Sequence, residues 1–267
     1  MRWQCSSKRP NTRGCDIVEY KSVFKRYELK YLMDEGQRAA IVDAIDEHMK
    51  RDRYGHCSVR NIYFDTPSFL LARRSISRPL YKEKLRIRSY GTPSSNDDVF
   101  VELKKKYDSV VYKRRLTMPL EEAMEWFCGD GESPKTQIGE EIGYMKVRYP
   151  DIGPAMFLSY DRDAYCAGSC SDLRITIDSN ILARTDDVDL SSPVGGHPVL
   201  PEGYTLMEIK TMYGYPEWLT KALSSSRLYK SRFSKYGNAY KEMVLGKMPE
   251  EFVRIPTGNA TVLQEAA

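Results

Sequence analysis

Cationic side chains occupy alternate positions of a short segment in the first half of the chain. In residues 80–90 these positions hold Lys82, Lys84, Arg86 and Arg88. Because alternate side chains of an extended strand point to the same face, all four cations share one face of a predicted strand. Like charges at this spacing repel one another, which predicts that an anionic partner lies among them.

Five other segments repeat this alternation of polar and apolar positions. Their polar faces hold Arg26, Glu28 and Lys30; Glu102, Lys104 and Lys106; Tyr160 and Arg162; Arg174, Thr176 and Asp178; and Glu208 and Lys210. An isolated strand of this kind usually turns its apolar face to the core and its charges to water. Recurrence on six segments favours the opposite placement, in which the charged faces line a shared interior.

The periodicity of the whole chain predicts strands with helices inserted between them. Strands are expected at 24–32, 58–65, 80–88, 99–106, 110–118, 155–165, 172–178 and 204–211, and helices at 34–49 (N-capped by Asp34), 119–127, 136–148, 216–223 and 234–244. The predicted fold class is α+β, mainly β: a closed antiparallel eight-stranded β-barrel with helices packed around the outside. We expect residues 1–22 to form a flexible N-terminal arm, 23–246 a single domain and 247–267 a C-terminal tail.

The bulk composition argues against several classes of protein. A net charge of +4 over 267 residues is too small to predict nucleic-acid binding. No apolar run approaches the ~20 residues of a transmembrane helix, and we expect no signal peptide. The six cysteines lack the pairing and neighbouring histidines of a zinc site, so we interpret them as reduced thiols of a cytoplasmic protein.

A barrel with its charged face inward would be a polar tunnel. Burying unpaired cations is costly, so carboxylates, water and a polyanion must fill it, and a triphosphate is the natural candidate. No Gly-rich phosphate loop is present, which leaves phosphate recognition to side chains. Glu28, Glu102 and Glu208 lie on the same faces as the cations, and their oxygens suit a magnesium or manganese ion that bridges phosphates.

Eight short segments, spread in order over most of the chain, carry a family resemblance. They are 27–31 (YELKY), 59–66 (VRNIYFDT), 81–91 (YKEKLRIRSYG), 99–104 (VFVELK), 160–162 (YDR), 173–178 (LRITID), 206–210 (LMEIK) and 232–236 (RFSKY). With this ordered set the chain resembles the polyphosphate-polymerase domain of the vacuolar transporter chaperone (VTC) family, a branch of the triphosphate tunnel metalloenzymes, also called CYTH-like. No single segment is specific, but the set is.

The resemblance implies a metal-dependent polyphosphate polymerase that passes the γ-phosphoryl group of ATP to a growing polyphosphate chain. By position, it implies catalytic phosphate contacts from Lys30, Arg86, Arg88, Lys104, Arg162 and Lys235; further phosphate contacts from Tyr160, Arg174, Arg232 and Ser234; and Mn²⁺ or Mg²⁺ on Glu208. Their places on the same polar faces make Lys84 and Lys210 further candidate phosphate contacts, and Glu102 and Glu28 further candidate metal ligands. The implied partners are a nucleoside triphosphate, polyphosphate, and pyrophosphate or orthophosphate.

Two positions depart from the family pattern. Arg26 stands where the wider superfamily's Glu-x-Glu-x-Lys signature has its first glutamate. This favours fewer metal ions and weakens an interpretation as a thiamine-triphosphate hydrolase or adenylate cyclase. Arg232 stands where the polymerase motif has a lysine, which keeps the charge but changes its geometry.

Other interpretations of the same residues are open at this point. Glu208 could form a surface salt bridge with Lys210, Glu102 and Glu28 could only orient lysines, and Tyr160 could be ordinary barrel core. We expect solvated or tunnel-mouth positions for Lys82, Lys106, Lys113, Arg114 and Arg115, and no catalysis from His48, His56 or His197. The chain could also be a tunnel triphosphatase that gives the phosphoryl group to water, or a module that only binds polyphosphate or triphosphate.

Overall fold

The computed structural model describes residues 27–245, apart from 78, 109 and 169–171 and the side chains of 53 and 54. The predicted arm and tail, and Arg26, therefore lie outside the described residues. The described elements are β1 (Tyr27–Met33), α1 (Glu35–His48), β2 (Lys50–Asp65), α2 (Leu70–Ser77), β3 (Tyr81–Tyr90), β4 (Asp98–Tyr107), β5 (Val110–Pro119), α3 (Leu120–Cys128), α4 (Gln137–Arg148), β6 (Gly153–Cys166), β7 (Arg174–Arg184), β8 (His197–Pro198), β9 (Thr205–Thr211), α5 (Glu217–Ser225), β10 (Lys230–Ser231) and α6 (Lys235–Met243).

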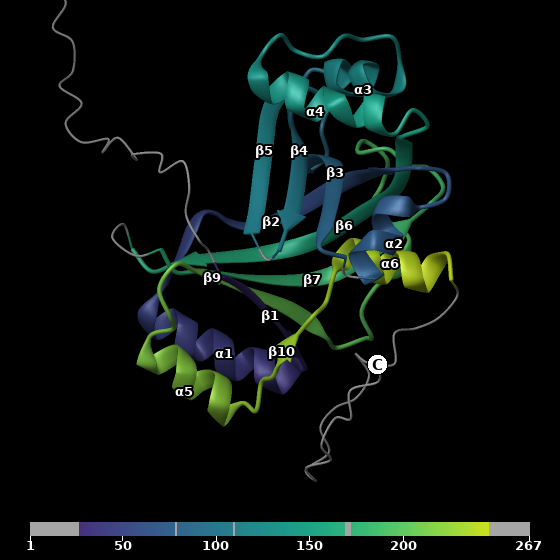
Figure 1. The fold of residues 1–267 in the computed structure, drawn as a ribbon. Coiled ribbons are helices and arrows are strands. Elements are labelled where there is room, and N and C mark those ends of the chain that lie inside the picture. Colours follow the sequence, from purple (N-terminus) through teal and green to yellow (C-terminus); the bar gives the residue numbers. More distant parts are fainter. Residues whose placement is uncertain (1–26, 78, 109, 169–171, 246–267) are drawn as a thin grey trace, which may run out of the picture.

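These strands form one antiparallel sheet that bends strongly, so that β3, β4 and β5 stand across the direction of β1, β7 and β9 (Figure 1). The sheet order is β10-β1-β9-β7-β6-β2-β3-β4-β5, and the two-residue β8 pairs with β7. The eight strands predicted from the sequence are all present, and the short β8 and β10 are additional. The largest differences in length are in β2, which begins at Lys50, and in β7, which continues to Arg184.

The prediction of a closed barrel is wrong, because β10 and β5 are the two ends of the described sheet and do not pair. The start of α6 lies between β1 and β3 instead. Lys30 of β1 donates a hydrogen bond to the Phe233 carbonyl at 3.1 Å, and Lys84 of β3 donates to Ser234 Oγ at 3.0 Å. Side chains and a helix end therefore span the opening between β1 and β3–β4, which we call the seam.

Two pairs of helices cover the outer, apolar face of the sheet, as the sequence predicts. α1, which Asp34 N-caps in a capping box, packs with α5 on β1, β7 and β9, and this core includes Ile41 and Leu219. α3 and α4 pack on β3 and β4 around Leu103 and Trp126. None of the helices in the described ranges combines the length and apolar character that crossing a membrane requires.

The third pair of helices, α2 and α6, packs against the inner face of the sheet. Tyr63, Leu158 and Leu206 alternate with outer-face residues and form a buried apolar cluster with Phe233 and Tyr240. The predicted polar interior is therefore only partly polar. Apolar side chains fill one end of the inner face under α2 and α6, and charged side chains hold the rest.

Candidate functional site

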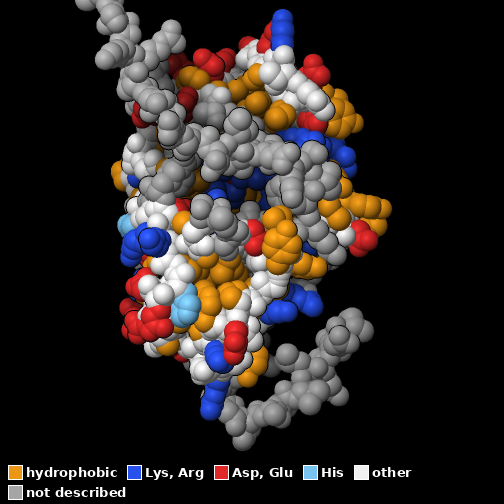
Figure 2. Space-filling model, turned by 90° about the vertical axis from the view of Figure 1, so that its left-hand side faces the viewer, with side chains coloured by type: hydrophobic (Ala, Val, Ile, Leu, Met, Phe, Trp, Pro, Cys, Tyr) orange, Lys and Arg blue, Asp and Glu red, His pale blue; other side chains and the backbone are white. Residues whose placement is uncertain are grey.

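The inner face of β3, β4 and β5, which we call the β3 wall, carries cations directly opposite one another. The register pairs Lys82 with Lys106, and it pairs Lys84 with Lys104, which is opposite Lys113 on its other side. Opposed side chains on neighbouring strands start about 5 Å apart, so these charges repel. Lys and Arg side chains gather in a hollow near the middle of the face in Figure 2.

Lys84 faces the N-terminus of α6. Its Nζ donates to Ser234 Oγ at 3.0 Å, and the same oxygen accepts the backbone N–H of Gly237 and so N-caps the helix. Burial, together with the ammonium groups of Lys30 and Lys104, holds the pKa of Lys84 well below its ordinary value. An anion placed here would be attracted by both the lysines and the helix N-terminus.

Glu102 is the carboxylate of the β3 wall and is only 2% exposed. Arg86 donates to its Oε2 from Nε and Nη2, at 2.8 and 2.6 Å. Lys113 Nζ lies 2.6 Å from Oε1, and Arg115 donates to that oxygen at 2.7 Å. Burial alone would raise the pKa of Glu102, but Arg86, Arg88 and Lys113 lower it. Because cations occupy both oxygens, this carboxylate is suited to orienting Arg86.

Lys113 and Arg115 were expected at solvated or tunnel-mouth positions. Both are part-exposed, yet both contact Glu102. Burial lowers the pKa of Lys113 to about 8, although Glu102 opposes the shift. Arg114 lies on the other side of β5 and donates to Glu141 of α4 at 2.7 Å. Alternation along β5 was the signal from which their inner-face position could have been predicted.

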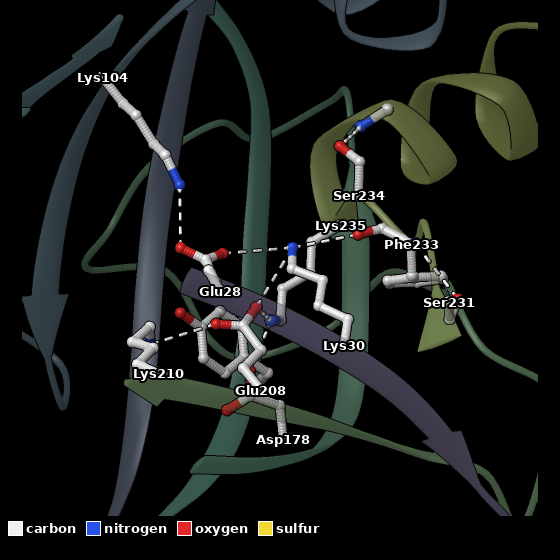
Figure 3. Close-up of polar contacts among 12 residues, drawn as sticks. Glu28, Lys30, Lys104, Asp178, Glu208, Lys210, Ser231, Phe233, Ser234 and Lys235 are labelled. Atoms are coloured by element: carbon white, nitrogen blue, oxygen red, sulfur yellow. Dashed lines mark hydrogen bonds and ion pairs between the residues drawn. The ribbon is translucent and has the colours of Figure 1, made fainter. Parts of the chain in front are cut away.

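The facing side of the site, which we call the β9 wall, is formed by β1, β6, β7, β9 and the start of α6. Its centre is Glu208 (Figure 3). The Nζ atoms of Lys30 and Lys235 lie 3.4 and 3.0 Å from Oε1, and that of Lys210 lies 3.3 Å from Oε2. Burial would raise the pKa of Glu208, but these three ammonium groups hold it well below its ordinary value. Glu208 is buried, so the alternative of a surface salt bridge is excluded.

Glu28 joins the two walls across the seam. Its Oε2 lies 3.3 Å from Lys104 Nζ of β4, and its Oε1 lies 3.7 Å from Lys30 Nζ (Figure 3). Burial would raise the pKa of Glu28, but Lys104, Lys30 and Lys210 lower it to about 2. The carboxylate is therefore ionised and shared between the walls.

Asp178 is a member of the β9 wall that the sequence placed on the polar face without assigning it a role. It is 0% exposed. Arg162 donates to both of its oxygens at 2.6 and 2.8 Å, and Lys235 Nζ lies 2.5 Å from Oδ2. Burial would lower the pKa of Lys235, but Asp178 and Glu208 raise it. Its position two residues after Thr176 on an alternating strand was the available signal.

Arg88 connects the two walls through β2 and β6. It donates to Asn61 Oδ1 and to the Tyr160 hydroxyl, both at 2.9 Å. The ring of Tyr160 lies under Lys235 Nζ and the Arg162 guanidinium, whose distances to its centroid are 4.8 and 5.0 Å. Tyr160 thus belongs both to the buried apolar cluster and to the charged site.

Two polar side chains of β2 were missed by the sequence analysis. They are Asn61, which accepts a hydrogen bond from Arg88, and Tyr63, whose hydroxyl accepts one from Arg86 at 3.0 Å. Their alternation with Ile62 and Phe64 gives the inner face of this strand. Nothing in their residue types marked them as partners of arginine.

Arg174 and Arg232, for which the resemblance implies phosphate contacts, are exposed and lie outside the hydrogen bonds and ion pairs described above for the two walls. Arg174 lies opposite Lys210 in the β7–β9 register, at the end of the polar row. Arg232 precedes Phe233, just before α6 begins. The other implied site residues all belong to one wall or the other.

The carboxylates suit only one kind of metal site. Within the described ranges, no group of three or more His, Cys, Asp or Glu residues could hold a metal ion. Glu28 and Glu208 share the ammonium of Lys30 between them. Magnesium commonly takes one or two carboxylates and completes its shell with phosphate oxygens and water. The residues therefore fit an ion that arrives with phosphates.

The histidines take part in neither wall. His56 Nδ1 lies 3.0 Å from Asp163 Oδ1, His48 stacks on Trp218, and His197 is exposed. The described cysteines are free thiols: Cys57, Cys128 and Cys166.

Comparison with known families identifies the chain. The model of the VTC domain family matches residues 25–244. Because this match covers most of the chain, the protein belongs to the VTC domain family, and the resemblance seen in its motifs is confirmed.

Two curated relatives carry the same name. Vacuolar transporter chaperone complex subunit 4 of Trypanosoma cruzi (strain CL Brener) is 24% identical over 275 residues, and that of Trypanosoma brucei brucei is 23% identical. Each match covers 81% of this chain and 34% of the relative. The chain thus spans about a third of the length of these relatives, so the activity of the whole relatives can only be proposed for it.

Solved structures show a weaker likeness. A candidate adenylate cyclase from Vibrio parahaemolyticus has a TM-score of 0.46 at 13% identity, with 83% of this chain and 98% of that chain covered. A candidate adenylyl cyclase from Hippeastrum, described as having a dominant triphosphatase activity, has a TM-score of 0.46 at 17% identity, with 84% and 98% covered. Both TM-scores lie below 0.5, and the family assignment stands without them.

Proposed function

We propose that this protein transfers the γ-phosphoryl group of ATP to a growing polyphosphate chain held between the β3 wall and the β9 wall. The observation that carries the proposal is the charge of the two facing surfaces. One has lysines in opposed rows around a single buried carboxylate, and the other has two buried carboxylates shared among lysines and an arginine. Membership of the VTC domain family supports the same activity.

The residues can do what phosphoryl transfer demands of a protein. That reaction needs donor and acceptor held in line and the charge on the transferring oxygens neutralised, with little covalent chemistry from side chains. Arg86, whose guanidinium Glu102 fixes, can bind phosphate oxygens through a planar fork. Lys84 and Lys104 supply point charges beside it. Preorganised charges of this kind stabilise a loose transition state.

The acidic side chains have a separate role in the proposal. Glu208 and Glu28 would hold Mn²⁺ or Mg²⁺ together with the substrate phosphates, and Lys30 would move from the carboxylates to a phosphate oxygen. When bound, the ion neutralises charge on the phosphates and on the leaving group. Asp178 keeps Arg162 and Lys235 charged and in place.

The test is to incubate the protein with ATP and Mn²⁺ and to analyse the products by gel electrophoresis and a phosphate assay. We expect long phosphate chains with release of ADP. Free phosphate alone would instead identify a triphosphatase. If neither phosphate chains nor free phosphate formed, the protein would be a module that only binds its ligand. Glu208→Gln should abolish chain formation, whereas Glu217→Gln, on a side chain 82% exposed on α5, should leave it unchanged.

Two further expectations from the sequence stay predictions. One is the cytoplasmic location. The other is the division of the chain into an arm, a single domain and a tail.

A further inference from the structure

Thr176 of β7 has a buried hydroxyl without a partner among the residues that the structure describes. The residue is 8% exposed, and its Oγ1 forms no hydrogen bond with any residue in the described part of the chain. Buried side-chain polar atoms in folded proteins nearly always have a hydrogen-bond partner, because leaving one unmade is costly. An orphaned hydroxyl therefore calls for an explanation.

The position of this hydroxyl is inside the candidate site. Thr176 lies directly opposite Glu208 in the β7–β9 register and opposite Ala164 in the β6–β7 register. It shares its face of β7 with Asp178, two residues further on, whose carboxylate binds Arg162. Opposed side chains on one face start about 5 Å apart. Thr176 is thus next to the central carboxylate of the β9 wall.

A second threonine, Thr205, allows the effect of an unpaired hydroxyl to be compared inside and outside the site. That residue of β9 is also 8% exposed, and its Oγ1 is also without a partner among the described residues. It lies on the outer face of β9, in line with Met207 and Ile209 of the outer core. Thr205 is therefore a threonine of equal burial outside the site, which makes it a matched control.

We propose that the Thr176 hydroxyl donates a hydrogen bond to a substrate phosphate oxygen bound beside Glu208. The proposal rests on the proposed function and names one further contact of that same site. The neighbouring oxygens of Glu208 are already occupied by Lys30, Lys210 and Lys235. A neutral donor next to this carboxylate can approach a phosphate without adding to the charge of the wall. Binding would then satisfy the group that the free protein leaves unpaired.

The experiment compares Thr176→Val, Thr176→Ser and Thr205→Val in the full chain. Binding of inorganic triphosphate is measured by calorimetry with and without Mn²⁺, and thermal stability is measured without ligand. Valine keeps the shape of threonine and removes the hydroxyl, so both valine variants should melt at a temperature equal to or above that of the wild type. Thr176→Val should bind triphosphate roughly ten- to a hundredfold more weakly, the range for a hydrogen bond to a charged group. Thr176→Ser and Thr205→Val should bind it like the wild type.

The outcomes separate this proposal from the one on which it rests. If wild type binds triphosphate and Thr176→Val binds it equally well, the hydroxyl makes no such contact and only this proposal fails. If wild type does not bind triphosphate at all, the proposed function fails and this proposal fails with it. Should Thr176→Val not fold, weak binding by Thr176→Ala beside normal binding by Thr176→Ser supports the contact, and equal binding by both overturns it.

Discussion

The two walls of the site are both built from lysines, arginines and carboxylates, but they differ in the proportion of carboxylates to cations. On the β9 wall, Glu208 and Asp178 are buried and each binds at least two cations, with Lys235 shared between them. On the β3 wall, lysines stand opposite lysines, and the one buried carboxylate, Glu102, is committed to its neighbours. Carboxylates neutralise most of the positive charge of the β9 wall, whereas the β3 wall is left with a large excess of positive charge.

This difference separates two tasks that one site must perform. Buried ion pairs hold their members in fixed positions. Removing one partner is costly, because the other charge is then left buried without a countercharge or solvating water. Opposed like charges do the reverse, since they reduce the stability of the free protein and favour any anion that relieves the repulsion. We infer that the β9 wall mainly fixes geometry and that the β3 wall mainly supplies attraction. Four predictions test this division.

The largest effect is expected from Asp178→Asn on the β9 wall. The amide would leave Arg162 and Lys235 without their shared countercharge in a fully buried position. We expect a loss of about 3–5 kcal/mol in the free energy of unfolding, measured by urea denaturation. The exposed Glu217→Gln should change it by no more than ~0.5 kcal/mol. A loss for Asp178→Asn as small as that of the control would contradict a wall held by buried pairs.

On the β3 wall, Lys84→Met should impair turnover and spare the fold. Losing one charged contact to the transferring phosphate raises the barrier by about 2–4 kcal/mol, or roughly 30- to 1000-fold in rate. Removing one of several opposed lysines also relieves repulsion, so the urea midpoint should stay the same or rise. Lys105→Met, on the other face of β4, is the matched control and should keep full activity. An equal loss of stability and activity in Lys84→Met would assign Lys84 a structural role instead.

Glu28, which joins the walls, should make stability depend on acid pH. Its folded-state pKa of about 2 is below its ordinary value of 4.5, so the folded state favours the ionised form. Its contribution is present in full above pH 4.5 and is lost as the pH falls towards 2. Denaturation midpoints measured across this range should fall less steeply for Glu28→Gln than for wild type. Parallel curves would show that Glu28 has no such role.

The smallest effect is a proton taken up on binding. Burial and neighbouring cations lower the pKa of Lys84 in the free protein, and a bound triphosphate would raise it again. Binding should therefore be accompanied by uptake of up to about one proton near the pH where Lys84 titrates. Calorimetry in buffers of different ionisation enthalpy measures this number, and Lys84→Met should reduce it. Identical uptake in wild type and variant would rule out Lys84 as the group.

Local alternation was enough to predict most of the strands and the inward charges. Period two places Lys84 and Lys104 on the face opposite Leu85 and Leu103, which the structure shows fully buried. The recurrence of such charged faces on six segments indicated that this face points inward. The same rule also applied to β5, where Lys113 could have been placed beside Glu102 from its spacing. These features depend on neighbours in sequence and are therefore readable from it.

Sheet closure could not be read in this way. Whether the first and last strands pair depends on the curvature of the whole sheet and on what lies between its ends. Here Phe233 and Ser234, at the start of α6, lie between β1 and β3. The apolar filling under α6 has the same origin, because Tyr236 and Tyr240 recur at helical spacing without indicating which face of the sheet they cover. Such contacts join segments far apart in the chain.

Under the proposed function, the seam gives a long phosphate polymer a sideways route to the site. A closed pipe must be threaded by a free end, and every unit must then slide through its whole length. Between the described strands, the link from β4 to β1 is a side-chain contact, Lys104 to Glu28, rather than a ladder of backbone bonds. Lys30 and Lys84 add side-chain hydrogen bonds to the start of α6 across the same opening. Under the proposed function, an extended phosphate chain could enter along its flank where these side-chain contacts part and re-form, without a terminus passing through.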